Sequence, residues 1–416
     1  MPRQRTLGWL GPGLIMAASG IGASDVMTAT VGGATYGVEL LWAVAFGAFL
    51  KFVLSEGMAR WQLATGTTVL EGWARHLPRW VSIAFAAYIV LWAVAVSGAL
   101  ITGCGLALEN LTRGAVPRSW GALAHAVAAF GFIYAARTRG FQRAMKPLIV
   151  VMFFSIVICA LFAFAGPAAF LRGLAVPTVP TGSGTYVLSI IGGIGGSLTL
   201  LSYNYLLRDE GTVSADDLPV VRRDLALAYV FTAIFGIAVM VIADRAFHAT
   251  GTTITGDVAI TRMAAQLREL IGPAGDWIYS LGFWAAVVAS LFGVWQSVPS
   301  IAADCYSLLR RQPAAERSAT MQPNSSVYRG FLGFMALASL PFAFTARPLF
   351  VIVAFTVIGS LFIPFLTGTL LYLNNRVPFP GPLRHNRPAT NGVLVVALMA
   401  FLAVVGLEIF ALGQTD

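Results

Sequence analysis

Charged residues are scarce in this chain: of its 416 residues only 11% are Asp, Glu, Lys or Arg. A soluble domain usually contains about 25% charged residues, so the composition excludes that class. The mean hydropathy is +0.78. The apolar residues fall in blocks of roughly 20, the length of helix that spans the hydrocarbon core of a bilayer. The sequence therefore predicts an all-α integral membrane protein.

Cysteine and histidine are also rare, with three and four residues respectively. Cys104, Cys159 and Cys305 show no CxxC spacing, so we interpret them as buried small side chains rather than metal ligands. We find no HExxH motif, and no paired-acid or Cys/His constellation of the kind that an enzyme would gather at one membrane interface. We therefore expect no enzyme activity and no resident cofactor. The net charge of +9 is better explained by arginine-rich loops at a membrane surface than by nucleic-acid binding.

We expect one transmembrane domain over residues 1–416, crossed by about eleven helices in the inner (plasma) membrane. These spans lie near residues 8–31, 38–62, 79–107, 119–136, 146–168, 184–207, 224–246, 274–305, 328–346, 348–374 and 392–412. Nineteen loop arginines and lysines fall on the side of the N-terminus. The other side has seven: Arg113, Arg118, Arg172, Arg245, Arg262, Arg268 and Arg347. The positive-inside bias then predicts a cytoplasmic N-terminus and an external C-terminus.

The first span contains polar residues where a membrane helix should be apolar. Gly20 and Gly22 weaken the helix, and Ser24 and Asp25 follow directly. A carboxylate at membrane depth usually faces a cavity or a partner, so Asp25 is a candidate binding residue. A broken helix is tolerated in a membrane where its freed carbonyl groups line a cavity. The stretch predicts a discontinuous helix that holds a polar solute.

A second span is interrupted in the same way. Residues 190–204 contain four glycines, including Gly196, followed by Thr199, Tyr203 and Asn204. The glycines alone are also explained by close helix packing. Paired glycine-interrupted spans in corresponding halves are typical of transporters built from inverted repeats. We therefore expect repeats over residues 8–168 and 184–374, with 392–412 as an additional span.

Four motifs in the first 66 residues carry a family resemblance. They are Gly11-Pro12-Gly13, Gly32-Gly33-Ala34-Thr35-Tyr36-Gly37, Leu40-Leu41-Trp42 and Ala64-Thr65-Gly66. The run resembles the first two spans of the Nramp divalent-metal transporters, which show GPG, AGAxYG, LLW and ATG at the same offsets. Later spans keep Asn204, Gln296-Ser297 and Pro364-Phe365. The resemblance implies a LeuT-type fold of two five-helix inverted repeats, with metal held between discontinuous helices 1 and 6.

The chain departs from this family at the metal site. The family's DPGN motif is Gly22-Ala23-Ser24-Asp25 here, so the carboxylate stands three residues later. Leu201 replaces the metal-binding Met, and Tyr203 replaces a His. The departures are similar to those of the Nramp-related prokaryotic branch associated with magnesium. Loss of a thioether and retention of oxygen donors favour hard cations such as Mg²⁺ or Mn²⁺.

We accordingly expect a monomeric secondary transporter or facilitator that moves Mg²⁺ or Mn²⁺ into the cytoplasm by alternating access. Asp25 would supply the charge, helped by Ser24 and the carbonyls around Gly22, Gly20 and Gly196. Thr199, Tyr203, Asn204 and Gln296 are further candidate ligands of ion-bound water. The few histidines predict weak or absent proton coupling, with His125 as a structural side chain. A transporter of a small organic solute or amino acid is the alternative.

Lys51 and Glu56 are candidate charge partners inside the second span. One hypothesis is a buried ion pair between them or with another helix. The other pairs Lys51 with Asp25, which would oppose a divalent cation and suit an uncharged or anionic solute. Asp304, late in the eighth span, either lines the inner exit of the transport path or, as is usual for an acid at a helix end, is solvated.

Overall fold

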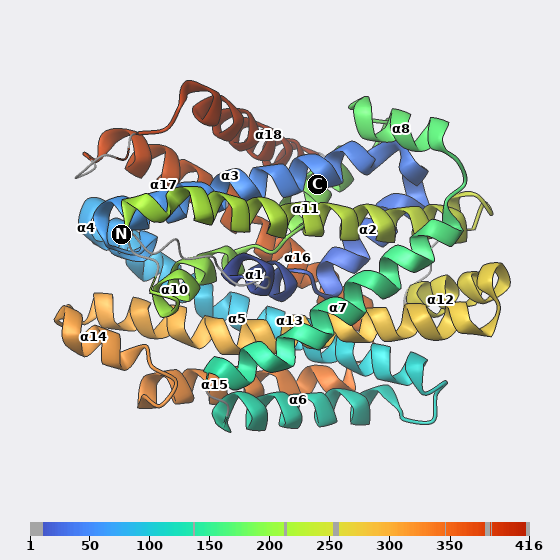
Figure 1. Ribbon diagram of the computed structural model, residues 1–416, viewed down its shortest axis with the longest axis horizontal. Helices are drawn as coiled ribbons and strands as arrows, with labels where there is room; N and C mark the ends of the chain where they lie inside the picture. The colour runs from blue at the N-terminus through green and yellow to red at the C-terminus, as the bar shows by residue number, and fades with distance from the viewer. Residues whose placement is uncertain are drawn as a thin grey trace.

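The computed structural model describes residues 11–135, 138–211, 214–252, 258–345, 347–378, 383 and 385–412 (Figure 1). All secondary structure within these ranges is helical. Eight helical stretches there are long and apolar enough to cross a membrane, and shorter helices accompany them. The predicted all-α membrane class is confirmed.

The helices follow the predicted spans. The first half of the chain forms α1 (Pro12–Gly20), α2 (Ala23–Tyr36), η1 (Gly37–Leu40), α3 (Leu41–Thr65), α4 (Val69–His76), α5 (Arg79–Leu111), α6 (Arg118–Ala135), α7 (Thr138–Ala163) and α8 (Pro167–Ala175). The second half forms α9 (Gly184–Gly193), η2 (Leu198–Leu201), α10 (Ser202–Asp209), η3 (Ala215–Asp217), α11 (Leu218–Ala243), η4 (Asp244–His248), α12 (Val258–Ile271), α13 (Pro273–Leu309), α14 (Ala314–Thr320), α15 (Ser326–Ser339), η5 (Leu340–Phe344), α16 (Pro348–Ser360), α17 (Phe362–Arg376) and α18 (Pro388–Leu412).

Local sequence sets where several helices begin and end. The α3 helix stops at Gly66, whose φ of +70° is a left-handed conformation that glycine adopts at low cost. The α4 helix starts with a capping box, in which the Thr68 hydroxyl accepts from the Glu71 amide and the Glu71 carboxylate accepts from the Thr68 amide. These two signals place a sharp corner between α3 and α4.

Both predicted interruptions are present. The first span breaks between α1 and α2, where Ile21 and Gly22 are not helical. The second breaks after α9, where Gly195 and Gly196 have φ of +81° and +85°. Because side chains other than glycine rarely adopt such angles, glycine is required there. The helix changes hydrogen bonding for one residue at Leu361, between α16 and α17, but its φ of −63° and ψ of −22° stay in the helical region.

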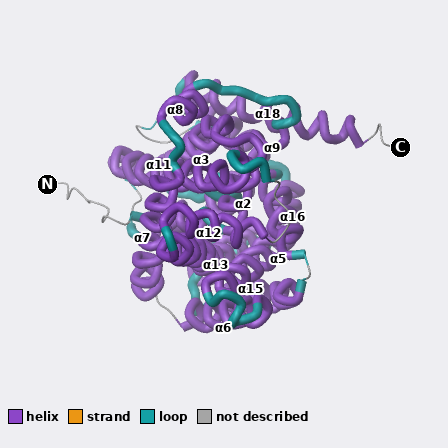
Figure 2. The backbone as a smooth tube through the Cα atoms, turned by 90° about the vertical axis from the view of Figure 1, so that its right-hand side faces the viewer, coloured by secondary structure: helices purple, strands orange, loops and turns teal. Residues whose placement is uncertain are grey.

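The helices form one bundle with the broken segments at its centre. Figure 1 shows α1 and α2 in the middle of the molecule, with α3 and α11 on one side and α13 and α5 on the other. In the perpendicular view, α6 and α15 lie at one edge, and α8 and α18 lie at the opposite edge (Figure 2). Large side chains such as Trp61, Trp92 and Trp295 are completely buried between these helices. This packing fixes the positions of the two breaks.

Candidate functional site

The two breaks touch each other through glycine. A methyl group at Gly20 would lie 2.9 Å from the carbonyl carbon and oxygen of Gly195. A methyl group at Gly196 would lie 2.3 Å from the Thr199 hydroxyl and 3.0 Å from the Gly20 Cα atom. Such distances leave no room for a side chain. The glycines therefore both break the helices and let the two breaks meet.

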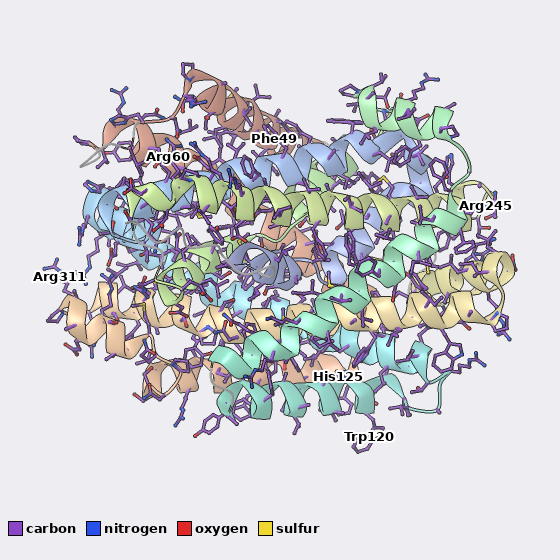
Figure 3. The ribbon with its side chains drawn as sticks, viewed as in Figure 1. Phe49, Arg60, Trp120, His125, Arg245 and Arg311 are labelled. Atoms are coloured by element: carbon purple, nitrogen blue, oxygen red, sulfur yellow. The ribbon has the colours of Figure 1, made fainter. Side chains whose placement is uncertain are left out.

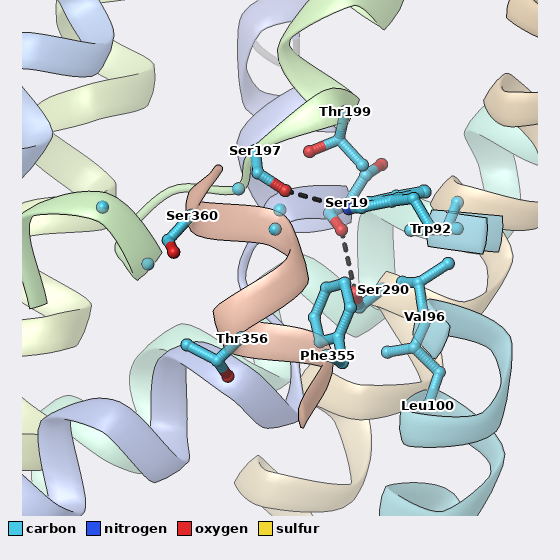
Figure 4. Close-up of a pocket in the computed structure, with 16 residues that line it drawn as sticks. Ser19, Trp92, Val96, Leu100, Ser197, Thr199, Ser290, Phe355, Thr356 and Ser360 are labelled. Atoms are coloured by element: carbon cyan, nitrogen blue, oxygen red, sulfur yellow. Dashed lines mark hydrogen bonds between the residues drawn. The ribbon is translucent and has the colours of Figure 1, made fainter. Parts of the chain in front are cut away.

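A small cavity of about 20 Å³ lies beside this contact (Figure 4). A volume of that size holds roughly one water molecule. Its lining comes from the two breaks and from α5, α13 and α16. None of the lining residues that the structure describes carries a charge: Ser19, Gly20, Trp92, Val96, Leu100, Gly192, Gly193, Gly196, Ser197, Thr199, Ser290, Val294, Phe355, Thr356, Gly359 and Ser360.

Hydroxyl groups supply most of the polarity of this cavity. The Ser290 hydroxyl donates to the Ser19 carbonyl at 2.8 Å, and the Trp92 indole donates to the Ser197 hydroxyl at 3.2 Å (Figure 4). The Thr199 hydroxyl is buried and has no hydrogen-bond partner among the described residues. A buried polar group left unsatisfied costs about 1–3 kcal/mol. Thr199 is therefore ready to bond a solute or water molecule in the cavity.

Asp25 connects the two breaks, and it lies outside the cavity lining. Its side chain is 2% exposed. Its Oδ1 atom accepts from the Gly195 amide at 2.7 Å, and its Oδ2 atom accepts from the Gly22 amide at 3.3 Å. The carboxylate also occupies the first turn of α2, where the helix dipole favours negative charge. Asp25 thus holds the backbone of both breaks in place.

Lys51 approaches the second break from α3. It is fully buried, and its ammonium group donates to the Gly192 carbonyl at 2.7 Å. Its aliphatic stem lies against Gly195. Asp25 accepts from the Gly195 amide, so both side chains reach the same break. The pairing of Lys51 with Asp25 stays a hypothesis.

Glu56 has different partners. Its Oε1 atom accepts from Arg222 at 2.7 Å, and its Oε2 atom accepts from Arg60 at 3.3 Å. The hypothesis of a Lys51–Glu56 ion pair is therefore wrong. The five-residue spacing directs the two side chains to different neighbours, Lys51 to α9 and Glu56 to α11.

Three other candidates lie away from the cavity lining. The Tyr203 hydroxyl donates to Asp224 at 2.9 Å, and the Asn204 amide donates to the Gln62 carbonyl oxygen at 2.5 Å. The backbone carbonyl of Gln296 accepts from Tyr328. Gly22 lies beside the cavity, with the Ser290 hydroxyl 2.6 Å from the position of a methyl group. Ser24 is in α2, but its side chain lies outside the described residues.

Several cavity residues were not singled out from the sequence. Ser290 on α13, and Thr356 and Ser360 on α16, join the lining, together with the aromatic rings of Trp92 and Phe355. Isolated hydroxyl residues are common in apolar helices, so no local pattern distinguishes these from the others. Their shared role becomes visible only once the helices are packed.

His125 has a structural role. One ring nitrogen lies 2.7 Å from the Gly121 carbonyl, and the other accepts from the Trp284 indole at 3.0 Å. Figure 3 places this residue on α6, at the edge of the bundle. Both nitrogens are engaged locally, as expected from the sequence.

A second buried polar group closes one end of the bundle. Asp304 on α13 is fully buried and accepts from Tyr205 at 2.7 Å and from Thr68 at 3.3 Å. Arg317 of α14 pairs with Asp304 at 3.0 Å and also with Glu71 of α4. The expectation of a solvated Asp304 is therefore wrong, because α14 folds back and covers it. Burial lowers the pKa of the Arg317 guanidinium, which nevertheless stays charged near neutral pH.

A resident metal centre is not evident in the described residues. They contain no group of three or more His, Cys, Asp or Glu side chains placed to hold an ion. The polar atoms at the breaks are hydroxyls, amides and carbonyls, beside the single carboxylate of Asp25. Such a site suits a solute that binds and leaves.

These features define a multi-pass membrane transporter with two discontinuous helices. The chain belongs to the Nramp family: the profile described as Natural resistance-associated macrophage protein-like matches residues 13–412. Members of this family are transporters, so the prediction that the chain is not an enzyme is confirmed.

Curated relatives share low identity with the chain. The Divalent metal cation transporter MntH of Pectobacterium carotovorum is 26% identical over 299 residues, which cover 69% of this chain and 70% of the relative. The protein of the same name from Deinococcus radiodurans is 22% identical over 424 residues, 96% of this chain and 90% of the relative. The resemblance therefore extends along nearly the whole length of the chain.

Solved structures show the same fold. A crystal structure of a mutant manganese transporter from Eremococcus coleocola matches with a TM-score of 0.67 at 14% identity, covering 96% of this chain and 86% of that one. The structure of MhsT in complex with L-phenylalanine matches with a TM-score of 0.60 at 16% identity, covering 97% and 99%. The predicted LeuT-type fold is confirmed.

Proposed function

We propose that the protein moves a hard divalent cation, Mg²⁺ or Mn²⁺, across the inner membrane by alternating access. The observation that carries this proposal is the meeting of two broken helices at a cavity whose polar lining is made of oxygen donors and backbone groups. Membership of the Nramp family and relatives named divalent metal cation transporters support it. Oxygen ligands suit Mg²⁺ and Mn²⁺.

The ligand chemistry supports a hard ion over a soft one. Leu201, at the position of the family's Met, is buried in η2 and offers no donor atom. We propose Thr199, Ser19 and the carbonyls near Gly20 and Gly196 as groups around the ion and its water. Asp25 lies behind this set: its carboxylate accepts from the Gly195 amide and contributes negative charge close to the cavity. Tyr203, Asn204 and Gln296 are left out of this set because none of them lines the cavity.

The central cavity, at about 20 Å³, is smaller than a hydrated ion. Mg²⁺ loses water reluctantly and usually keeps several water molecules when bound. We propose that the cavity widens when the repeats over 8–168 and 184–374 move relative to one another. The N-terminus is cytoplasmic, the C-terminus is external and the protein is a monomer in this proposal. Coupling to protons is weak in this proposal, because both ring nitrogens of His125 are engaged structurally.

The proposal is tested by comparing Asp25→Asn with the native chain. Loss of the charge should weaken Mg²⁺ and Mn²⁺ binding at least tenfold in isothermal titration, equivalent to about 1.4 kcal/mol. It should also reduce divalent uptake into proteoliposomes. Asp216→Asn, a change in an exposed connector, is the charge-matched control and should behave as the native chain. Unchanged binding by Asp25→Asn would contradict the proposed role of Asp25.

A small organic solute or amino acid is the second candidate. It is favoured by the amine of Lys51, which bonds the same break as Asp25, and by the aromatic Trp92 and Phe355 in an uncharged lining. Thermal stability distinguishes the two candidates. Mg²⁺ or Mn²⁺ should raise the unfolding temperature of a cation transporter, and a panel of amino acids should leave it unchanged. The reverse pattern would support the organic solute.

A further inference from the structure

A large cleft opens at the end of the bundle that carries most of the arginines. It measures about 980 Å³, far more than the central cavity. One wall is the second half of α3, another is the start of α11, and the third is the segment that leads into α18. Its lining comprises Phe52, Val53, Glu56, Arg60, Leu218, Arg222, Leu383, His385, Asn386, Arg387, Pro388 and Thr390. The proposed transport function uses none of these residues.

The cleft is positively charged. Three arginines face one carboxylate in its lining, an excess of two positive charges with His385 neutral. Glu56 is shared by Arg222, through Nε at 3.0 Å and Nη2 at 2.7 Å, and by Arg60. A guanidinium has five N–H donors, so Arg222 retains donors beyond those used on Glu56. Its side chain is 44% exposed, and those donors are available to a ligand in the cleft.

The third wall is fixed in place. Arg60 donates to the side-chain oxygen of Asn386. The Asn386 amide donates to Asn391 at 2.8 Å, and Asn391 also bonds Asn375 of α17 at 3.0 Å. These bonds join α3, α17 and the start of α18. Arg387 therefore lies on a segment that is held by Asn386 on one side and by Asn391 on the other.

The cleft changes from polar to apolar along α3. Arg60 and Glu56 lie nearer the end of the helix, and Phe52 and Val53 lie one to two turns earlier. Phe49 continues the same side of α3 and is 47% exposed. Figure 3 shows Phe49 along α3 beside α18, with Arg60 further toward the end of the helix. Along α3, the charged side chains therefore lie toward the end of the helix and the apolar ones toward its middle.

We propose that this cleft binds the headgroup of an anionic phospholipid, with an acyl chain lying along Phe52 and Phe49. The forked guanidinium matches the geometry of a phosphate group. Basic pockets between membrane helices are suited to anionic headgroups, and each arginine near a membrane surface contributes attraction to such lipids. The amphipathic order along α3 fits a lipid better than a free anion. The proposal is independent of the transported solute.

Lipid adducts of the purified protein, counted by native mass spectrometry, test the proposal. We expect phosphatidylglycerol to bind more tightly than phosphatidylcholine of the same chain length. Arg387→Gln should lower the affinity for phosphatidylglycerol about fivefold. Adding Arg222→Gln should lower this affinity about fivefold again, and each step corresponds to ~1 kcal/mol. Arg79→Gln, an exposed arginine at the start of α5, is the control and should retain the lipid.

Three results would overturn the assignment. If phosphatidylglycerol and phosphatidylcholine bind equally well, the cleft is not a site for anionic lipid. The same holds if Arg387→Gln and Arg79→Gln bind phosphatidylglycerol equally well. Inorganic phosphate that displaces phosphatidylglycerol and binds as tightly would identify a free anion as the ligand instead. The Arg387 side chain is exposed, so the single variant decides the question even if the Arg222 change impairs folding.

Discussion

Thr199 and Asp25 contribute to the central site in different ways. Thr199 lines the cavity with an unsatisfied hydroxyl, whereas Asp25 lies outside the lining and holds backbone amides of both breaks. The sequence could indicate Asp25 because a carboxylate at membrane depth is unusual. It could not rank Thr199 above Ser202, since only the packed structure distinguishes a satisfied hydroxyl from an unsatisfied one. Ser202 donates to the Thr199 carbonyl at 2.5 Å.

Thr199→Val should reduce transport without weakening the fold. Valine has nearly the same shape as threonine, with a methyl group in place of the hydroxyl. Because the buried Thr199 hydroxyl has no partner, the free energy of unfolding should stay the same or rise by about 1 kcal/mol. Divalent uptake into proteoliposomes should fall about tenfold, because a hydrogen bond to the solute or its water is lost.

The matched control is Thr367→Val on α17. The Thr367 hydroxyl is fully buried and donates to the Ile363 carbonyl at 2.7 Å. This change should lower stability by about 1 kcal/mol and leave uptake unchanged. Native uptake by Thr199→Val would remove Thr199 from the proposed site.

At the scale of elements, the two broken helices are the features that the sequence predicts well. Glycine clusters inside apolar spans are local signals, and their energetic meaning does not depend on distant residues. The single-residue turn between α16 and α17 at Leu361 has no such signal, because the composition is continuous across it. The cavity lining was missed for a related reason: it depends on which faces of α5, α13 and α16 meet.

Gly196→Ala should destabilise the protein strongly. Its φ of +85° is unfavourable for alanine, and the added methyl group would lie 2.3 Å from the Thr199 hydroxyl. The strained angle and the overpacking together should cost about 2 kcal/mol or more. Thermal unfolding in detergent measures the effect. Gly184→Ala, at the start of the same interrupted span where nothing lies within 4 Å, should unfold as the native chain does. A native unfolding temperature for Gly196→Ala would show that the break is not rigid.

At the scale of the molecule, the Asp304 group joins elements that are far apart in sequence. Arg317 of α14 binds α13 and α4, and Tyr205 connects α10 to the same carboxylate. With the proposed orientation, this group closes the cytoplasmic end. Composition around α14 is polar and gives no sign that the segment folds back over Asp304. Long-range ion pairs of this kind cannot be inferred from local sequence.

Arg317→Gln should loosen this closed end. Removing one partner of a buried ion pair leaves the other charge uncompensated and typically costs about 3–5 kcal/mol. The neighbouring Cys305 is buried and free, so its reaction with a maleimide reports opening. In a background in which Cys104 and Cys159 are alanine, we expect labelling about tenfold faster, equivalent to ~1.4 kcal/mol. Arg310→Gln, in the same connector, should label at the native rate, and equal rates for both variants would refute the closure role.

Lys51 has a consequence for how membrane voltage would act on the proposed transport cycle. While Lys51 and Asp25 are both ionised, the two groups at this break contribute no net charge when the unloaded protein changes conformation. Voltage then acts mainly on the loaded form, where a divalent ion gains about 2.3 kcal/mol per elementary charge for each 100 mV. An interior-negative cell would draw the ion inward without a second gradient, and the unloaded protein would reset at the same speed at any voltage.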